Sequence, residues 1–299
     1  MNKRCAAVVL SALLVPVLLH ARSEGHFDRT LQVSGAVSLD VTTGSGDITV
    51  KTGSSNQVVV HGTVRSSNWF GSDNAVRQAE SSPPIEQSGN SIRIGYNLPE
   101  DVRRHVSISY EITTPAETSL QAHSGSGNVE AAGVRSNVQL QTGSGDIRVH
   151  DTGRLRAQTG SGNIRVDDAA APFYAQTGSG DIEATLTGSG DVDAQTGSGN
   201  IRVRGIKGGV RARTGSGEID ADGRVAGPWQ LHSGSGNIRL VVGSATGFNL
   251  NAHTSSGSIH SALPITVQGS LGEHKLQGAV GGGGPEVELS TGSGDVDIR

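Results

Sequence analysis

The sequence predicts an all-β fold, a single-stranded β-solenoid with coils of about 18 residues. Three observations predict it. Glycine supplies 44 of 299 residues while aromatic residues supply 3%, so any core must be built from small aliphatic side chains. A Gly-Ser-Gly motif recurs at nearly constant spacing, and the residues flanking it alternate between apolar and polar. The handedness of the coil does not follow from these observations.

The first 23 residues have the composition of a secretory signal peptide. Lys3 and Arg4 precede an apolar stretch, and small residues lie at Ala21 and Ser23. The stretch is shorter than the roughly 20 residues that a membrane-spanning helix needs. We therefore expect an exported chain over residues 24–299, without a transmembrane segment, in the periplasm, at the cell surface or outside the cell. Cys5 precedes the apolar stretch, so no disulfide or lipid anchor is expected.

Charge and composition exclude several classes of function. Removal of residues 1–23 takes away three basic residues and no acidic one, so the formal net charge falls from −4 to −7. Nucleic-acid binding needs clustered positive charge, which an acidic chain of this kind lacks. The sequence also contains no phosphate-binding loop, nucleophile triad or metal-binding motif. We expect no enzyme activity, no catalytic or metal-ligating residues and no cofactor.

The repeated unit is TGSGDI or a close variant. From Gly125 to the degenerate copy at Ser255, leaving Gly188 aside, successive motifs are 17 to 21 residues apart. Gly188 divides one such step nearly in half, which predicts two corners in each coil. The Gly-Ser-Gly motif forms one corner and ordinary turn residues form the other. Glycine suits the corner because it tolerates close approach of neighbouring backbones.

Aligning the motifs produces columns of equivalent residues. An isoleucine column after the corner and an alanine-rich column before it point inward, while a column from His123 to His253 points outward. Coils stack about 4.8 Å apart, so equivalent residues form ladders. We expect aligned threonines such as Thr142 and Thr159, and aligned glutamines, to hydrogen-bond to their own kind. At the position after the corner Asp and Asn alternate, which separates like charges and predicts a role in shaping the turn.

Residues 65–105 lack the motif and are expected to form a cap or insertion. They include Trp69 and Phe70, a short predicted helix over 73–80 and two consecutive prolines. A cap is needed because a bare solenoid end exposes apolar core and unpaired backbone. The Trp69 and Phe70 pair either attaches this segment to the rod or contacts a ligand.

The chain ends in TGSGDVDIR, inside a complete repeat. Its distance from the preceding motif corresponds to about two coils, and a flexible corner is expected at Gly281–Gly284. This pattern predicts that the C-terminal coil is an open end of the rod. Such an end would associate with a second copy or another partner.

Several segments resemble the bacterial putative-adhesin family, a group of exported β-solenoids with a domain of unknown function. The resemblance rests on VSLDVTTGSGDITV at 37–50, QVVVHGTV at 57–64 and VSISYEITTPAETSLQAHSGSGNVEA at 106–131. It implies an envelope or surface location and brings no catalytic residues to this sequence.

Together these observations favour a non-catalytic envelope protein, an adhesin or binding scaffold, with a glycan, an envelope protein or itself as partner. Two alternatives stay open. The corner aspartates are placed as in calcium-binding β-rolls. Polysaccharide-active enzymes also use β-helices, and four charged residues are candidates for such a site, in one outward column after the corner: Glu183, Asp193, Arg202 and Asp220.

His232 and His253 share an outward column and are expected on neighbouring coils, where they could bind a metal or respond to pH.

Overall fold

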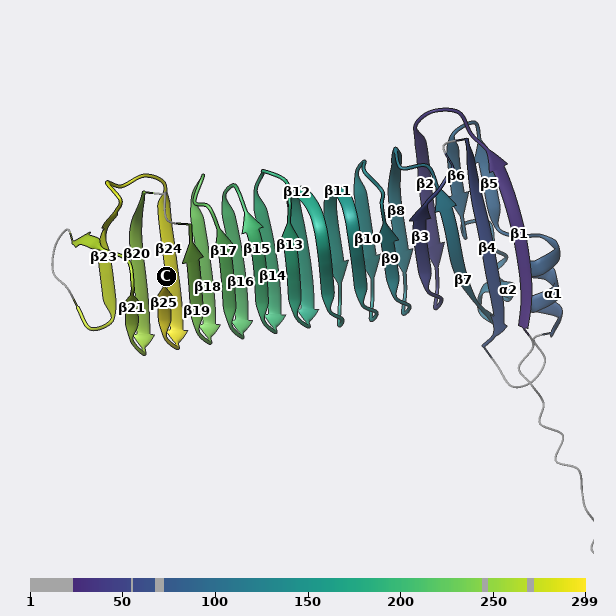
Figure 1. Cartoon of the computed structure of the whole chain (residues 1–299). Helices are drawn as coiled ribbons and strands as arrows, with labels where there is room; N and C mark the ends of the chain where they lie inside the picture. Colours follow the sequence, from purple (N-terminus) through teal and green to yellow (C-terminus); the bar gives the residue numbers. More distant parts are fainter. Residues whose placement is uncertain (1–23, 55, 68–72, 244–246, 268–271) are drawn as a thin grey trace, which may run out of the picture.

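The computed structural model describes residues 24–54, 56–67, 73–243, 247–267 and 272–299. Within these residues the chain forms 25 strands of one continuous, mostly parallel sheet that folds into a long rod, consistent with a β-solenoid (Figure 1). Each Gly-Ser-Gly corner joins a strand on one face of the rod to a strand on the other. We call these two faces the pre-corner face and the post-corner face.

The pre-corner face contains the strands that lead into each corner. Its parallel strands are, in spatial order, β2 (Val37–Thr43), β8 (Thr118–Ser124), β10 (Val138–Thr142), the second half of β11 (Ile147–Thr159), the second half of β12 (Ile164–Ser179), β14 (Val192–Ser198), β16 (Val210–Ser216), β18 (Trp229–Ser235), β24 (Glu286–Ser293) and β20 (Phe248–Ser256).

The post-corner face contains the strands that leave each corner. Its parallel strands are, in spatial order, β7 (Val106–Thr114), β3 (Ile48–Thr52), β9 (Val129–Ala132), the first halves of β11 and β12, β13 (Ile182–Leu186), β15 (Ile201–Ile206), β17 (Ile219–Gly223), β19 (Ile238–Val242), β25 (Val296–Ile298) and β21 (Ile259–Ser261).

The core lies between the two faces and consists of ladders of equivalent residues. Ile147, Ile164, Ile182, Ile201 and Ile219 are each at most 1% exposed and lie side by side in register. Burying one such side chain contributes about 1.5–3 kcal/mol. The period-two alternation seen in the sequence is therefore the alternation of core and surface, as predicted.

The corner ladders form hydrogen bonds, but not all of the expected ones. Thr159 Oγ1 donates to the carbonyl oxygen of Gly145 on the adjacent coil, 2.8 Å away, and Thr142 donates in the same way to Gly127. The expectation that threonines bond to each other is wrong here, because their hydroxyls point into the turn and meet its carbonyls first. Gln158 and Gln176 do bond to each other, at 3.1 Å.

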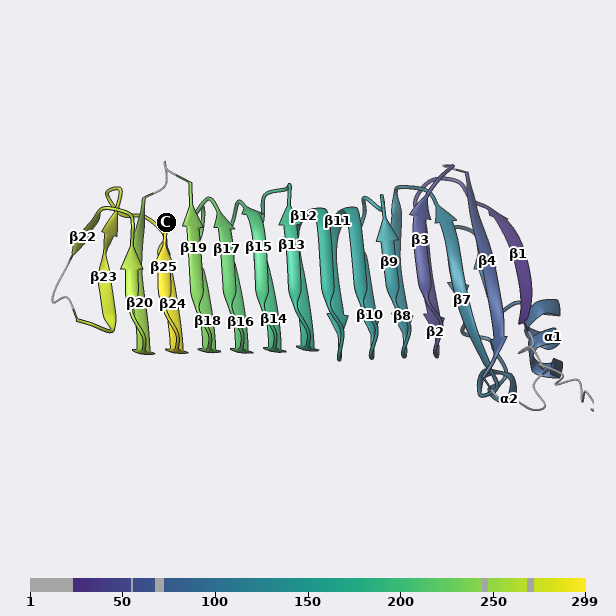
Figure 2. The same cartoon turned by 60° about the horizontal axis from the view of Figure 1, so that its bottom comes forward.

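An antiparallel cap closes the N-terminal end of the rod (Figure 2). β1 (Glu24–Gln32) pairs with β4 (Gln57–Ser66), β4 pairs with β7, and β5 (Ile85–Ser88) pairs with β6 (Ser91–Ile94), which extends the sheet beyond β2. Helix α1 (Asp73–Ser81), close to the expected 73–80, contacts β1 and β4 through the buried Val76 and Ala79, and α2 (Glu100–Arg103) precedes β7. The described part of the motif-free segment, from α1 to α2, thus lies at this end of the rod together with β1 and β4.

The C-terminal coil is not an open end, and this corrects the expectation. β24 lies between β18 and β20, and β25 lies between β19 and β21. The last coil in space is the one formed by residues 248–261. On the pre-corner face β23 (Lys275–Val280) and β22 (Ile265–Val267) continue it as antiparallel strands (Figure 2). Sequence spacing could not reveal this, because all coils carry the same motif and can stack in more than one order.

Candidate functional site

A long groove runs along the pre-corner face, across the strands. It has a volume of about 800 Å³ and crosses seven of them, from β8 to β18. With strands about 4.8 Å apart, it extends roughly 30 Å along the rod. Its surface is made mainly by two outward columns near the start of these strands: Ser119, Asn137, Arg154, Pro172, Asp191, Gly209 and Pro228, and then Gln121, Gln139, Arg156, Tyr174, Asp193, Arg211 and Gln230.

The middle of the groove contains an aromatic ring held by a polar network. The guanidinium carbon of Arg156 lies 4.1 Å from the ring centre of Tyr174, a cation–π arrangement. The Tyr174 hydroxyl donates to Gln176 Oε1 at 2.6 Å, and Gln158 Nε2 donates to the same oxygen at 3.1 Å. These contacts fix the orientation of the ring, so it forms a rigid, amphipathic surface in the groove.

Arginine and aspartate side chains both line the groove, and they differ in their hydrogen-bond and ion-pair partners. Arg154, Arg156 and Arg211 form no ion pair among the described residues, although Arg156 Nε donates to Gln158 Oε1 at 3.4 Å and Arg211 donates to Gln230 at 3.3 Å. Asp191 Oδ1 accepts the backbone N–H of Gly209 at 2.9 Å, and Asp193 Oδ1 accepts Gln195 Nε2 at 2.8 Å. One oxygen of each carboxylate is therefore used within the fold, and the other oxygen and the guanidinium groups can still bind a ligand.

The sequence analysis did not single out this groove. The signal that could have found it is the outward column containing Tyr174, in which Tyr174 is the only aromatic residue among glutamine, arginine and aspartate. The register needed to align that column follows from the motif. The groove lies next to the turns at the second corner, which have no common sequence.

The charged residues considered for an enzyme do not form one site. Glu183, Arg202 and Asp220 lie in one ladder on the post-corner face, where Arg202 Nε is 3.2 Å from Asp220 Oδ2. Placing Asp193 in that column was wrong, because it lies on β14 and on the opposite face. The Gly188 motif occupies a second corner, so the strand after it leads into the next Gly-Ser-Gly corner.

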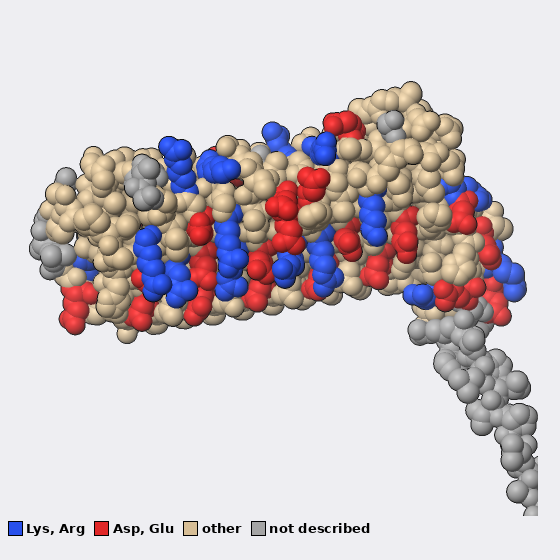
Figure 3. Space-filling view, viewed as in Figure 1, with Lys and Arg blue, Asp and Glu red and all other residues tan. Residues whose placement is uncertain are grey.

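Acidic and basic side chains alternate along the post-corner ladder from Arg165 to Asp297. Arg165 is 3.4 Å from Glu183, and Arg239 is 3.9 Å from Asp297. Stripes of both signs are visible along the rod in Figure 3. These pairs are partly exposed, so each contributes little to stability. The ladder is therefore a partly exposed row of weak ion pairs.

His232 and His253 are not on neighbouring coils, which corrects the expectation. Ser290 of β24 lies between them in the ladder. Two strand spacings separate the histidines by about 9.6 Å. No group of three or more His, Cys, Asp or Glu in the described part of the chain is arranged to hold a metal ion.

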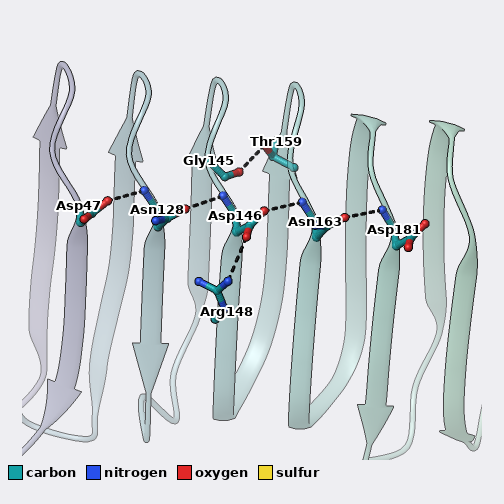
Figure 4. Close-up of polar contacts among 8 residues, drawn as sticks. All are labelled: Asp47, Asn128, Gly145, Asp146, Arg148, Thr159, Asn163 and Asp181. Carbon is teal, nitrogen blue, oxygen red and sulfur yellow. Dashed lines mark hydrogen bonds and ion pairs between the residues drawn. The ribbon is translucent and has the colours of Figure 1, made fainter.

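The corner Asp and Asn side chains hydrogen-bond between coils. Asn128 Oδ1 accepts the backbone N–H of Asp146, Asp146 Oδ1 accepts that of Asn163, and Asn163 Oδ1 accepts that of Asp181, each at 2.9 Å (Figure 4). One oxygen of each of these side chains is thus used by the next coil. Asn accepts this hydrogen bond as Asp does, so either residue can occupy the position.

A serine, a histidine and an aspartate also meet near the end of the post-corner face. Ser258 Oγ is 2.7 Å from Asp295 Oδ1 and 3.0 Å from His260 Nε2. The hydrogen bond from Ser258 holds the pKa of Asp295 below its ordinary value of 3.8. In a catalytic triad the histidine lies between the serine and the carboxylate. Here the serine lies in the middle and donates to the carboxylate, so the arrangement fixes the corner.

The family model described as Toastrack DUF4097 matches residues 36–299, which is most of the chain and the whole rod. The chain belongs to the toastrack family. The resemblance stated from the sequence segments is thereby confirmed. In this toastrack rod the strands of each face lie side by side along the long axis of the molecule (Figures 1 and 2).

Solved structures resemble this toastrack chain over most of its length at low identity. A putative lipid binding protein from Parabacteroides distasonis is 11% identical, with 92% of this chain and 97% of that chain covered and a TM-score of 0.35. A putative adhesin from Bacteroides fragilis is 13% identical, with 93% and 98% covered and a TM-score of 0.25. A putative cell adhesion protein from Clostridium sporogenes is 12% identical, with 92% and 99% covered and a TM-score of 0.24. No curated protein matches the chain.

Two features expected of this toastrack chain fall outside the described residues. They are the signal peptide over residues 1–23 and the Trp69 and Phe70 pair. Among the residues that are described, no helix is long and apolar enough to cross a membrane.

Proposed function

We propose that this chain is a non-catalytic, exported binding rod of the cell envelope, a β-solenoid with coils of about 18 residues whose groove holds a linear glycan. The observation that carries the proposal is the groove itself, with Tyr174 and Arg156 stacked at its centre. Its long axis follows the rod, so it fits a polymer better than a compact ligand.

The chemistry of the groove suits a sugar chain. A sugar ring has apolar C–H faces that pack against an aromatic ring, and hydroxyl groups that bind amides, carboxylates and guanidinium groups. The groove offers Tyr174 for the first and, for the second, glutamine, aspartate and arginine side chains on successive strands. Because these side chains repeat along the rod, many weak contacts add up along one polymer.

Support for a non-catalytic role comes from the charges. The carboxylates in the groove are Asp191 and Asp193, and both accept hydrogen bonds within the fold. Export and the envelope location rest on the composition of residues 1–23 and on family membership.

Binding to a panel of neutral and acidic polysaccharides tests the proposal. We expect Tyr174→Ala to lower the affinity for the bound polymer about tenfold, equivalent to about 1.4 kcal/mol. The matched control is Tyr96→Ala, because Tyr96 is 41% exposed and also stacks with an arginine, Arg93 at 4.1 Å, but lies in the N-terminal cap. Equal affinities of the two variants, or no binding to any polymer, would refute the groove as a glycan site. Release of sugar products in the same incubations would refute the non-catalytic role.

A further inference from the structure

The C-terminal coil fills a slot whose two walls come from residues that precede it. One wall is formed by β18 and β19, the other by β20 and β21. In chain order, the strands of both walls come first, followed by the antiparallel strands β22 and β23. The last segment, β24 and β25, then lies back between the two walls. The slot lies inside the sheet, with a strand edge on each side.

The coil bonds to both walls through the same ladders that join all other coils. Asn237 Oδ1 accepts the backbone N–H of Asp295 at 2.8 Å, and Asp295 Oδ1 accepts that of Ser258 at 2.8 Å. The Thr291 hydroxyl donates to Gly236 at 2.8 Å, and the Thr254 hydroxyl donates to Gly294 at 2.9 Å. The contacts made in the slot come from residues 285–299 and do not depend on how this segment is linked to the rest.

The link is a run of four glycines before Pro285. Gly281, Gly282 and Gly283 have φ values of 55°, 86° and 84°, a left-handed conformation that favours glycine. In the structure the turn is held by the Gly283 N–H, which donates to the Val280 carbonyl, and by Asn249 Nδ2, which donates to the Gly284 carbonyl, each at 3.0 Å. Glycines adopt many other backbone conformations, so this segment can act as a hinge between the strands on either side. Domain swapping between identical chains exchanges an element that is joined to the rest of its chain by a hinge and whose contacts do not involve that hinge.

Charge favours an occupied slot. Without the coil, the β19 and β21 ladders would meet directly and place Arg239 beside His260 with no acidic residue between them. In the structure Asp297 lies between the two, with Arg239 Nε at 3.9 Å. The occupied slot thus gives Arg239 an acidic neighbour that the closed slot would lack, whichever chain supplies the coil.

We propose that the slot also accepts the C-terminal coil of a second copy of this chain, giving a reciprocally exchanged dimer. The bonds in the slot are identical in the dimer and the monomer, so the linker and the chain concentration decide between them. A short flexible linker keeps its own coil at an effective concentration in the millimolar range. Monomers therefore dominate in dilute solution, and exchange increases when chains fold close together.

Cross-linking by single cysteines tests the exchange. Ser235 and Ser293 are exposed partners on β18 and β24, and Cα atoms on adjacent strands lie within the range that a disulfide spans. One chain carries Ser235→Cys and the other Ser293→Cys, both with Cys5→Ser, and the two are unfolded, mixed, refolded and oxidised. The control mixture replaces Ser235→Cys by Ser198→Cys, an exposed residue at an equivalent corner whose partners are Ser179 and Ser216.

We expect a disulfide between the two chains in the 235/293 mixture and not in the 198/293 mixture. While monomers dominate, a tenfold higher chain concentration during refolding should raise the linked fraction about tenfold. Deleting Gly281–Gly283 should raise it further, because a shortened hinge prevents the coil from reaching its own slot. Equal cross-linking in both mixtures, or none in either at the highest concentration, overturns the proposal. If the deletion prevents folding, the comparison of the 235/293 and 198/293 mixtures with the native hinge tests the exchange by itself.

Discussion

The side chain of Asn237 accepts the backbone N–H of Asp295 at 2.8 Å, although the two residues are 58 positions apart in the chain. In the regular repeats the same bond joins residues one repeat apart, as between Asn163 and Asp181, which are 18 positions apart, whereas near the cap it joins Asp47 to Asn128, 81 positions apart. The bond is chemically the same in each place. The repeat therefore specifies how coils join, but not which coil joins which.

The corner ladder predicts different effects for two substitutions of Asn163. Asn163→Ala removes the acceptor for the backbone N–H of Asp181 and should lower the free energy of unfolding by about 1 kcal/mol. Asn163→Asp keeps the acceptor but places three carboxylates on successive coils, between Asp146 and Asp181. Its cost should therefore shrink at high salt, where the repulsion is screened. Urea unfolding at low and high salt measures both effects. A salt-dependent loss in the alanine variant as large as in the aspartate variant would contradict this account.

The inward hydroxyl at the end of each pre-corner strand contributes through one hydrogen bond. Ser233 is fully buried and donates to the carbonyl oxygen of Gly217 at 2.8 Å. Ser233→Ala removes this bond with little change in volume and should lower the free energy of unfolding by about 1 kcal/mol. Ser235→Ala, at an exposed position of the same strand, is the control and should change it by less than about 0.5 kcal/mol. Similar midpoints of chemical unfolding for the two variants would show that the buried bond is not stabilising.

The first glycine of the motif is required only where another coil lies against it. A Cβ atom at Gly125 would lie 2.2 Å from the carbonyl oxygen of Gly44, whereas a Cβ at Gly44 would meet nothing within 4 Å. Gly125→Ala should lower the free energy of unfolding by about 1–3 kcal/mol through overpacking, and Gly44→Ala by much less. Thermal or chemical unfolding of the two variants tests this. Equal destabilisation would mean that glycine is needed for its flexibility alone.

Acid should weaken the corner at the end of the rod through Asp295. Hydrogen bonds from Ser258 hold the pKa of Asp295 below 3.8, so the stabilisation is present above that value and is lost as the pH falls through the lowered pKa. Asp295→Asn keeps an acceptor for the Ser258 N–H but does not ionise. Between about pH 6 and about pH 2 the variant should therefore lose less stability than the native chain. Parallel curves of stability against pH would rule out this contribution.

Much of the fold could be predicted from the sequence, and the groove only in part. The isoleucine ladder from Ile147 to Ile219, the polar outward columns and the motif-free cap follow from the repeat. Tyr174 and Arg156 could be placed in one outward column, but their stacking depends on side-chain torsions that the repeat does not fix. The separation of His232 from His253 and the opposite faces of Asp193 and Asp220 depend on coil order and on which corner a motif occupies. Neither is determined by spacing alone.

The sequence by itself determined the local structure: turns at the glycine motif, strands of alternating character between them, and a narrow aliphatic core. These features depend on residues close together in the chain, and periodicity records them directly. Only the tertiary structure decided that residues 285–299 lie between coils that precede them, and that a groove crosses seven strands. The physical reason is that every coil presents the same hydrogen-bonding edge. The order of stacking is then decided by side chains that differ between coils, such as Asp297 between Arg239 and His260, and by the hinge that lets the chain return.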